Sequence, residues 1–354
     1  MKRSNQYDIE INFKTTGKNT LLFSSSIPYL GSATNLDNVK IYSKKIILSC
    51  KRAAIINLDE IFYNDNSSLY NQVIKCLVYY YSLNFNCPKI KEISVTRKGS
   101  SAILDRKTLT IDLIIQPVSG KITSNIIFNP NTIEVLFEES EKGKTILIAL
   151  SYWLKAMSTN DSIFTFERLW RGLNSIYSLI GAHRNETQCH IALRALLIVN
   201  PHILTNSSLE VNGYTSQYLR KSFRWRAMIL NDYSTINKTE AFRDFILRYS
   251  DERIVRMFDE TLPYRQDFLN RQGFLAAVSG HITANLATSL KSNTELVALL
   301  CIKYSYFIRN KSFHGEKIDG SFRLMVNKEI IELEKINKLQ SFFVADLINS
   351  HNVY

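Results

Sequence analysis

The chain has 354 residues, of which 45% are hydrophobic, and it carries a formal net charge of +12. That hydrophobic content excludes a disordered polar chain, and the length suffices for about two ordinary domains. The five cysteines show no close metal-ligand spacing, and their odd number is typical of reduced thiols, so we expect a cytoplasmic protein. No apolar stretch reaches the roughly 20 residues of a membrane span, so no membrane contact is expected.

The positive charge is shared by both parts of the chain. The first 150 residues and the remainder each carry about +6. A basic surface helps a polyanion such as RNA to approach, but charge alone does not identify a nucleic-acid partner.

Residues 1–158 are predicted to form a mixed α+β domain. Strand character, from β-branched or alternating residues, is found at 7–13, 39–50, 53–58, 90–97 and 108–118. The polar, proline-containing stretch 24–38 is expected to be a loop, and 67–85 one helix capped near Ser67. This domain contains no phosphate-binding glycine loop, metal cluster or nucleophile arrangement. Its role, as a recognition module, a sensor or a dimerisation scaffold, stays open.

Residues 159–354 are predicted to form an all-α domain, because apolar residues recur there at helical spacing. Helices are predicted at 164–180, 186–199, 219–230, 239–248, 251–259, 272–290 and 325–348. The polar stretch 206–218 is expected to be a loop.

Residues 219–226, LRKSFRWR, combine basic and aromatic side chains in one predicted helix. Basic groups can contact phosphates, and the rings of Phe223 and Trp225 can stack on unpaired bases. The candidate RNA contacts are Arg220, Lys221, Arg224 and Arg226. An amphipathic helix with solvated basic side chains explains the same pattern.

One further helix carries the residues with the most chemical content. Ser292 and Glu295 fit a capping box, so the helix is predicted to begin there. Its apolar residues lead to Arg309 and Asn310, and four residues separate Arg309 from His314.

The Arg-to-His spacing by itself is a weak signal. With 19 Arg and 6 His, a pair separated by four to six residues is expected about once by chance. Arg184 and His190 form a second such pair, and Asn185 follows Arg184 as Asn310 follows Arg309. The context favours Arg309, which ends a long apolar helix, whereas His190 lies among apolar residues as structural histidines do.

The fragment 309–315, RNKSFHG, resembles the signature of the HEPN superfamily, small helical domains of which many are metal-independent ribonucleases. The fragment 166–177, FERLWRGLNSIY, is similar to the first long helix of one branch of that superfamily. The resemblance implies catalytic roles for Arg309, Asn310 and His314, with no metal and no cofactor. Lys311 and Lys317 are further candidate RNA contacts.

The implied chemistry suits these residue types. The RNA 2′-OH attacks the phosphorus and leaves a 2′,3′-cyclic phosphate and a 5′-hydroxyl. A histidine with a pKa near neutrality can take or give the proton, and a guanidinium can hold two phosphate oxygens.

The resemblance also implies partners. They are RNA, a second copy of the chain through the helical domain, and an inhibitory antitoxin or activating trigger, as in toxin and antiviral-defence systems. Helix geometry agrees with a dimer, because positions five apart on an unbroken helix differ by about 140°. Arg309 and His314 of one chain then converge only if the helix breaks before His314. The alternative is a non-catalytic HEPN-like module that binds RNA or protein, with both residues serving structure only.

Overall fold

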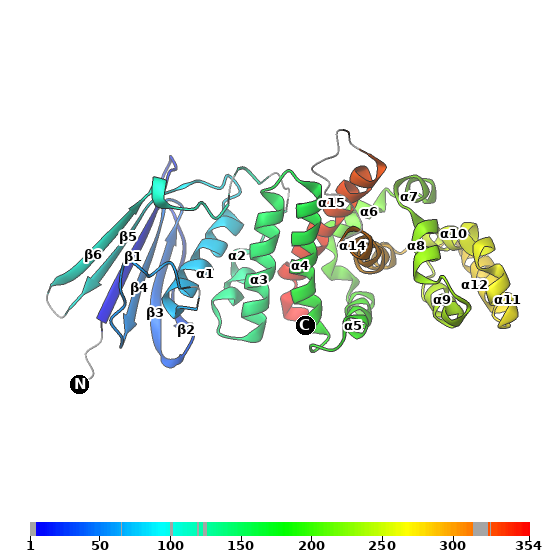
Figure 1. Ribbon diagram of the computed structural model, residues 1–354, viewed down its shortest axis with the longest axis horizontal. Helices are drawn as coiled ribbons and strands as arrows, with labels where there is room; N and C mark the ends of the chain where they lie inside the picture. Colours follow the sequence, from blue (N-terminus) through cyan, green and yellow to red (C-terminus); the bar gives the residue numbers. More distant parts are fainter. Residues whose placement is uncertain are drawn as a thin grey trace. The chain divides into compact units, whose positions relative to one another are not determined.

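The computed structural model describes residues 5–64, 66–99, 102–118, 120–122, 126–313, 325 and 327–354. The predicted fold class, an α+β part followed by an all-α part, is confirmed (Figure 1). The chain divides into two compact units. Unit 1 comprises Met1–Asn160, Trp170–Leu179 and Ile348–Tyr354, and unit 2 comprises Asp161–Leu169 and Ile180–Leu347. Helix α4 (Ser162–Ile180) therefore contributes residues to both units.

Unit 1 is built on one antiparallel sheet with the strand order β2-β3-β4-β1-β5-β6. The strands are β1 Asn5–Phe13, β2 Leu21–Tyr29, β3 Ser32–Tyr42, β4 Lys45–Arg52, β5 Ile90–Lys98 and β6 Ile103–Thr110. In the central strand β1, Tyr7, Ile9, Ile11 and Phe13 are buried, and the residues between them are half-exposed. This alternation is typical of an antiparallel sheet that is covered on one face.

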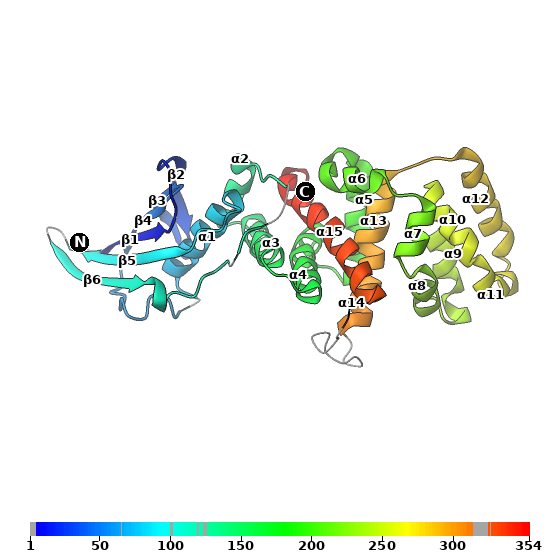
Figure 2. The ribbon, with the colours of Figure 1, turned by 90° about the horizontal axis from the view of Figure 1, so that it is seen from above.

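Helix α1 (Ser68–Leu83) covers the buried face of the sheet. It contacts β2, β3 and β4 on one side and α3 (Glu141–Met157) on the other (Figure 2). The rings of Phe13 and Tyr80 stack with centres 3.8 Å apart. The helix predicted at 67–85 is thereby confirmed, because its apolar stripe faces the sheet. A short helix, α2 (Pro130–Ile133), precedes α3.

Three strand-and-loop predictions in unit 1 are wrong. The stretch 24–38 is no loop but most of the β2–β3 hairpin, since Ile27 turns into the core. The stretch 53–58 is no strand, because the Tyr7 hydroxyl donates to Ala54 O and accepts the Ile56 N–H at 2.8 Å, which holds an irregular turn. Strand β6 ends at Thr110, and a 3₁₀ turn follows it.

The regular secondary structure among the described residues of unit 2 is helical. Besides the part of α4 that it contains, its helices are α5 Glu186–Val199, α6 Thr205–Asn212, α7 Ser216–Ser222, α8 Trp225–Asp232, α9 Thr239–Leu247, α10 Glu252–Thr261, α11 Gln266–Arg271, α12 Leu275–Thr288, α13 Asn293–Ala298, α14 Ser305–Phe313 and α15 Lys328–Asn349. The predictions at 186–199 and 239–248 are confirmed to within one residue at each end.

The predicted loop at 206–218 is wrong, because α6 occupies most of it. The residue before α6, Leu204, offers no capping side chain. Instead, the buried carboxylate of Asp346 on α15 accepts the N–H groups of Asn206 and Ser207 at 3.0 and 2.8 Å. A partner distant in sequence thus completes a helix start that has no local signal.

Candidate functional site

The predicted helix with the Arg-Asn motif is one continuous helical segment, here called the motif helix (Asn293–Phe313). It consists of α13, a π-helical stretch η6 (Leu299–Tyr304) and α14. The Ser305 hydroxyl donates to Leu300 O, five residues back, at 2.9 Å. Such widened turns are often found at functional sites, and they change which residues share a helix face.

The predicted capping box at the start of this helix is half confirmed. Ser292 Oγ accepts the Glu295 N–H at 3.3 Å, as expected. The Glu295 carboxylate, however, accepts the N–H groups of Ser250 and Asp251 at 2.7 and 2.9 Å. In return, Asp251 Oδ2 accepts the Ser292 N–H at 2.6 Å. Glu295 on the motif helix thus caps the segment before α10, and Asp251 before α10 caps the start of the motif helix. These reciprocal bonds tie the motif helix to the start of α10.

Arg309 and Asn310 lie together on α14. The Arg309 Nη1–H donates to Asn310 Oδ1 at 3.0 Å, and both side chains are half-buried. Among the residues that the structure describes, Arg309 has no carboxylate partner. Lys311 is exposed on the last turn of the same helix. His314 and Lys317 lie outside the described residues.

Several other arginines of unit 2 are held by carboxylates. The pairs are Arg220 with Glu260, Arg224 with Glu329 and Glu332, Arg243 with Glu240 and Asp244, Arg253 with Asp251, and Arg256 with Glu252. Arg309 therefore differs from these five in carrying a charge that no described carboxylate neutralises.

The basic-aromatic stretch is not one helix, so that prediction is wrong. Helix α7 ends at Ser222, Phe223 is extended with φ −130° and ψ 144°, and α8 begins at Trp225. Phe223 and Trp225 are only 5% and 4% exposed, and both rings lie 5.3 Å from the ring of Tyr304. The expectation that these two rings stack on bases is therefore also wrong, because they belong to the core.

Three of the four predicted RNA contacts nevertheless meet. Arg220, Arg224 and Arg226 line one pocket of about 210 Å³, together with Tyr264. Tyr264 is 41% exposed, and the Arg226 guanidinium lies 4.0 Å from its ring centre. Lys221 is exposed and does not line this pocket.

Arg224 is engaged in a buried cluster. Its backbone N–H donates to the Tyr304 hydroxyl at 2.6 Å, and its guanidinium donates to Glu332 at 2.7 Å and to Glu329 at 2.8 Å. The Tyr304 hydroxyl in turn donates to Glu332. Burial opposes the charge on Arg224, but Glu332, Tyr304 and Glu329 raise its pKa above the ordinary value. A phosphate at Arg224 has to compete with two carboxylates.

Arg184 precedes α5 and His190 lies on α5, and together they form the competing pair. Arg184 is exposed after a tight turn in which Ala182 and His183 have φ near +50° (51° and 54°). The ring of His190 packs edge-on against Tyr306, with centres 5.4 Å apart. Burial lowers the pKa of His190 to about 4, so only roughly one molecule in a thousand is protonated there at pH 7. Such a histidine is a poor proton donor, which again favours the Arg309 segment.

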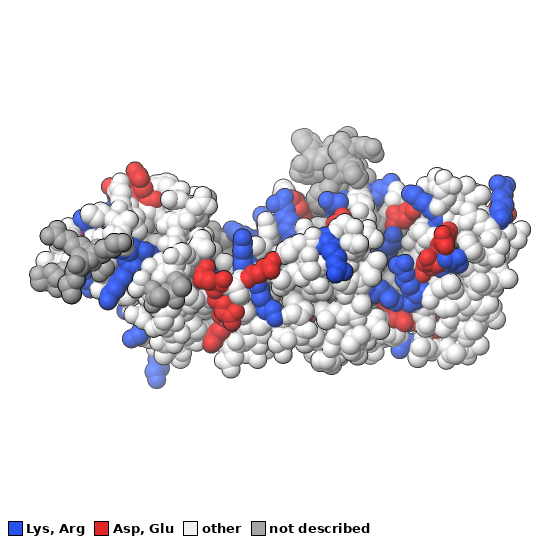
Figure 3. All heavy atoms as spheres, turned by 90° about the horizontal axis from the view of Figure 1, so that it is seen from below, with Lys and Arg blue, Asp and Glu red and all other residues white. Residues whose placement is uncertain are grey.

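The described residues show neither a metal site nor a helix that could span a membrane. No group of three or more His, Cys, Asp or Glu among the described residues could hold a metal ion. None of the described helices is long and apolar enough to cross a membrane. Figure 3 shows basic and acidic side chains interspersed on the face that it displays, rather than one continuous basic surface.

Comparisons with known proteins find no matching family model, no matching curated protein and no matching solved structure. The HEPN assignment and the nuclease activity therefore remain predictions.

Proposed function

We propose that unit 2 is a metal-independent endoribonuclease that cleaves RNA by attack of the 2′-OH. The observation that carries the proposal is the half-exposed Arg309 beside Asn310, with no carboxylate partner among the described residues. A guanidinium in this state can hold two oxygens of the scissile phosphate as negative charge develops on it. Asn310 orients the Arg309 guanidinium or a phosphate oxygen.

In this proposal His314 transfers the proton. It accepts the proton of the 2′-OH or donates one to the departing 5′-oxygen, and the products are a 2′,3′-cyclic phosphate and a 5′-hydroxyl. No bond to a metal is required for either step.

A two-fold dimer supplies the geometry. Helix α14 is regular as far as Phe313, so Arg309 and a residue five positions later converge within one chain only if the helix breaks directly after Phe313. In a dimer, Arg309 of one protomer and His314 of the other meet across the axis without such a break. By analogy with HEPN ribonucleases, the enzyme acts as a toxin or defence effector that is held inactive by an antitoxin or until a trigger arrives.

The test is cleavage of a single-stranded RNA by the full chain in excess EDTA. We expect cyclic-phosphate ends by mass spectrometry, and a rate loss of about 10²–10⁴-fold in His314→Ala and about 10²–10³-fold in Arg309→Ala. Arg271→Ala, at an exposed arginine on α11, is the matched control and should keep full activity. Cleavage that survives His314→Ala, or that requires Mg²⁺, would refute the mechanism.

The second candidate function is a non-catalytic RNA- or protein-binding module. It is favoured by the pocket of Arg220, Arg224 and Arg226 with the exposed Tyr264, which offers cations and a ring, while the carboxylate of Glu260 in its lining is paired with Arg220. Under this alternative, host cells tolerate expression of the unmutated chain as well as they tolerate the double variant Arg309→Ala/His314→Ala. Under the nuclease proposal, only the intact protein arrests growth, although both chains fold alike by circular dichroism.

A further inference from the structure

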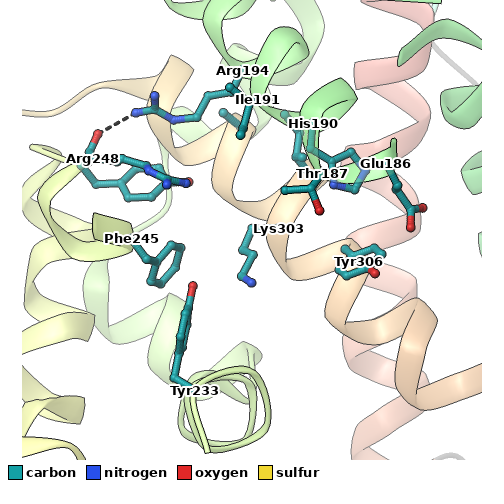
Figure 4. A pocket seen from close by; sticks show the side chains of 13 residues that line it. Glu186, Thr187, His190, Ile191, Arg194, Tyr233, Phe245, Arg248, Lys303 and Tyr306 are labelled. Atoms are coloured by element: carbon teal, nitrogen blue, oxygen red, sulfur yellow. Dashed lines mark hydrogen bonds between the residues drawn. The ribbon is translucent and has the colours of Figure 1, made fainter. Parts of the chain in front are cut away.

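A second pocket of unit 2 lies on the side of the motif helix that carries Lys303 and Tyr306. It is enclosed by α5, by residues 233–249 and by the motif helix, and its volume is about 190 Å³ (Figure 4). A cavity of about 150 Å³ holds one benzene molecule, and pockets for drug-sized ligands begin at roughly 300 Å³. The pocket therefore suits a single ring system rather than a large ligand.

The charged side chains around this pocket favour an anion. Arg194, Arg248 and Lys303 line it, against the single carboxylate of Glu186. Lys303 pairs with Asp232 at 2.7 Å, so its charge is partly neutralised. Arg248 is exposed and has no ion pair among the described residues.

Arg194 is held in a fixed position at the wall of the pocket. Its Nη2–H donates to the backbone oxygen of Arg248 at 2.6 Å, which fixes the guanidinium 5.0 Å from the ring centre of Tyr249. Its Nε is buried and has no hydrogen-bond partner in the described part of the chain. Because Nε is inaccessible, Arg194 offers a ligand its fixed positive charge rather than this donor.

Aromatic side chains form much of the remaining wall. Figure 4 shows His190 and Tyr306 on one side and Tyr233 and Phe245 on the other, with Lys303 between them. The Lys303 ammonium lies 5.1 Å from the ring centre of Tyr233 and 5.6 Å from that of Phe245. His190 and Tyr306 are half-buried residues, whereas Tyr233 and Phe245 are buried. An aromatic wall beside fixed cations is how proteins hold an unpaired base and its phosphate.

Two of the proposed catalytic residues follow the pocket residue Tyr306 along α14. Arg309 and Asn310 follow Tyr306 by three and four positions on α14, so all three share one face of the helix. The axial distance from Tyr306 to Arg309 is about one turn, roughly 5 Å. An RNA strand bound at Arg309 can therefore place a neighbouring nucleotide in the pocket.

We infer that this pocket receives one unpaired base of the RNA substrate, with Arg248 and Lys303 at the adjoining phosphate. The inference rests on the proposed ribonuclease function. It restricts the substrate to RNA that is single-stranded at that nucleotide, because a base inside a duplex cannot enter.

Binding is measured in a His314→Ala background, so that cleavage does not interfere. The probe is a fluorescently labelled single-stranded RNA, followed by anisotropy at fixed ionic strength. We expect Arg248→Glu to weaken binding about tenfold or more, and the matched charge reversal Arg271→Glu to weaken it less than about twofold. Tyr306→Ala should also cost about tenfold, whereas Tyr306→Phe, which keeps the ring, should bind like the parent.

Competition identifies what occupies the pocket. Nucleoside 5′-monophosphates should displace the labelled RNA, and inorganic phosphate or a duplex of the same sequence should do so at least about tenfold less well. Equal effects of Arg248→Glu and Arg271→Glu would overturn the inference. The inference would also be overturned if a nucleoside monophosphate bound in an Arg248-dependent way without displacing the RNA, because the pocket would then bind a free nucleotide. Cleavage by the unmutated chain is assayed separately, so loss of the proposed function and loss of this pocket's role give different results.

Discussion

Replacing Asp251 with alanine tests whether reciprocal capping holds the motif helix in place. The Asp251 carboxylate is 0% exposed, pairs with the buried Arg253 guanidinium at 2.7 Å, and accepts the Ser292 N–H. Removing one partner of a buried ion pair costs about 3–5 kcal/mol, because the other charge stays buried without it. Arg253 keeps hydrogen bonds to Val211 O and Asn293 Oδ1, both at 3.0 Å. We therefore expect Asp251→Ala to lower the free energy of unfolding of unit 2 by about 3–4 kcal/mol.

The assay is urea unfolding by circular dichroism, combined with hydrogen exchange of peptides from α10 and α13 to report on unit 2. Glu252→Ala is the control, since its i,i+4 ion pair is with Arg256, whose side chain is 49% exposed, and such a pair should be worth less than about 1 kcal/mol. Asp251→Ala/Arg253→Met removes both buried charges and should recover about half of the loss. If Asp251→Ala costs no more than Glu252→Ala, the reasoning about the reciprocal caps is refuted.

Two further predictions concern stability. The pKa of His190 is about 4 in the folded state and about 6.5 in an unfolded chain, so the unfolded state binds the proton first and stability falls as the pH drops from about 6.5 to 4. Urea unfolding at pH 7 and at pH 4 measures this loss of unfolding free energy, and His190→Gln should reduce the loss by up to about 3 kcal/mol. The control His202→Gln, at an exposed histidine, should leave the loss unchanged. Gly181→Ala places a Cβ 2.7 Å from Cys189 Cα and should lower the free energy of thermal unfolding by about 1–3 kcal/mol. Gly280→Ala, in open space on α12, should raise it by about 0.5–1 kcal/mol. Equal melting temperatures for these two variants would contradict this packing.

Helices whose caps lie within their own sequence could be predicted closely. Asn185 caps α5 by accepting the Gln188 N–H at 3.0 Å, and the predicted helix at 186–199 agrees with α5. At α6 the sequence wrongly predicts a loop, because the cap of this helix, Asp346, lies about 140 residues away in the chain. The sequence pattern also predicts one helix at 219–226, because the aromatic and basic residues there suit an amphipathic surface. Burial of Phe223 and Trp225 against Tyr304 instead breaks that helix.

For the candidate site, the sequence alone determined the motif helix, its Ser292 cap and the adjacency of Arg309 and Asn310, since each depends on residues within about four positions of one another. Only the tertiary structure decided that Glu295 caps a different segment and that Asp251 caps Ser292 in return. It also decided that Arg194, Arg248 and Lys303 meet in one pocket beside Tyr306. The physical reason is that local hydrogen bonds and helical periodicity are encoded over a few residues, whereas ion pairs and pocket walls depend on how helices far apart in the chain pack together.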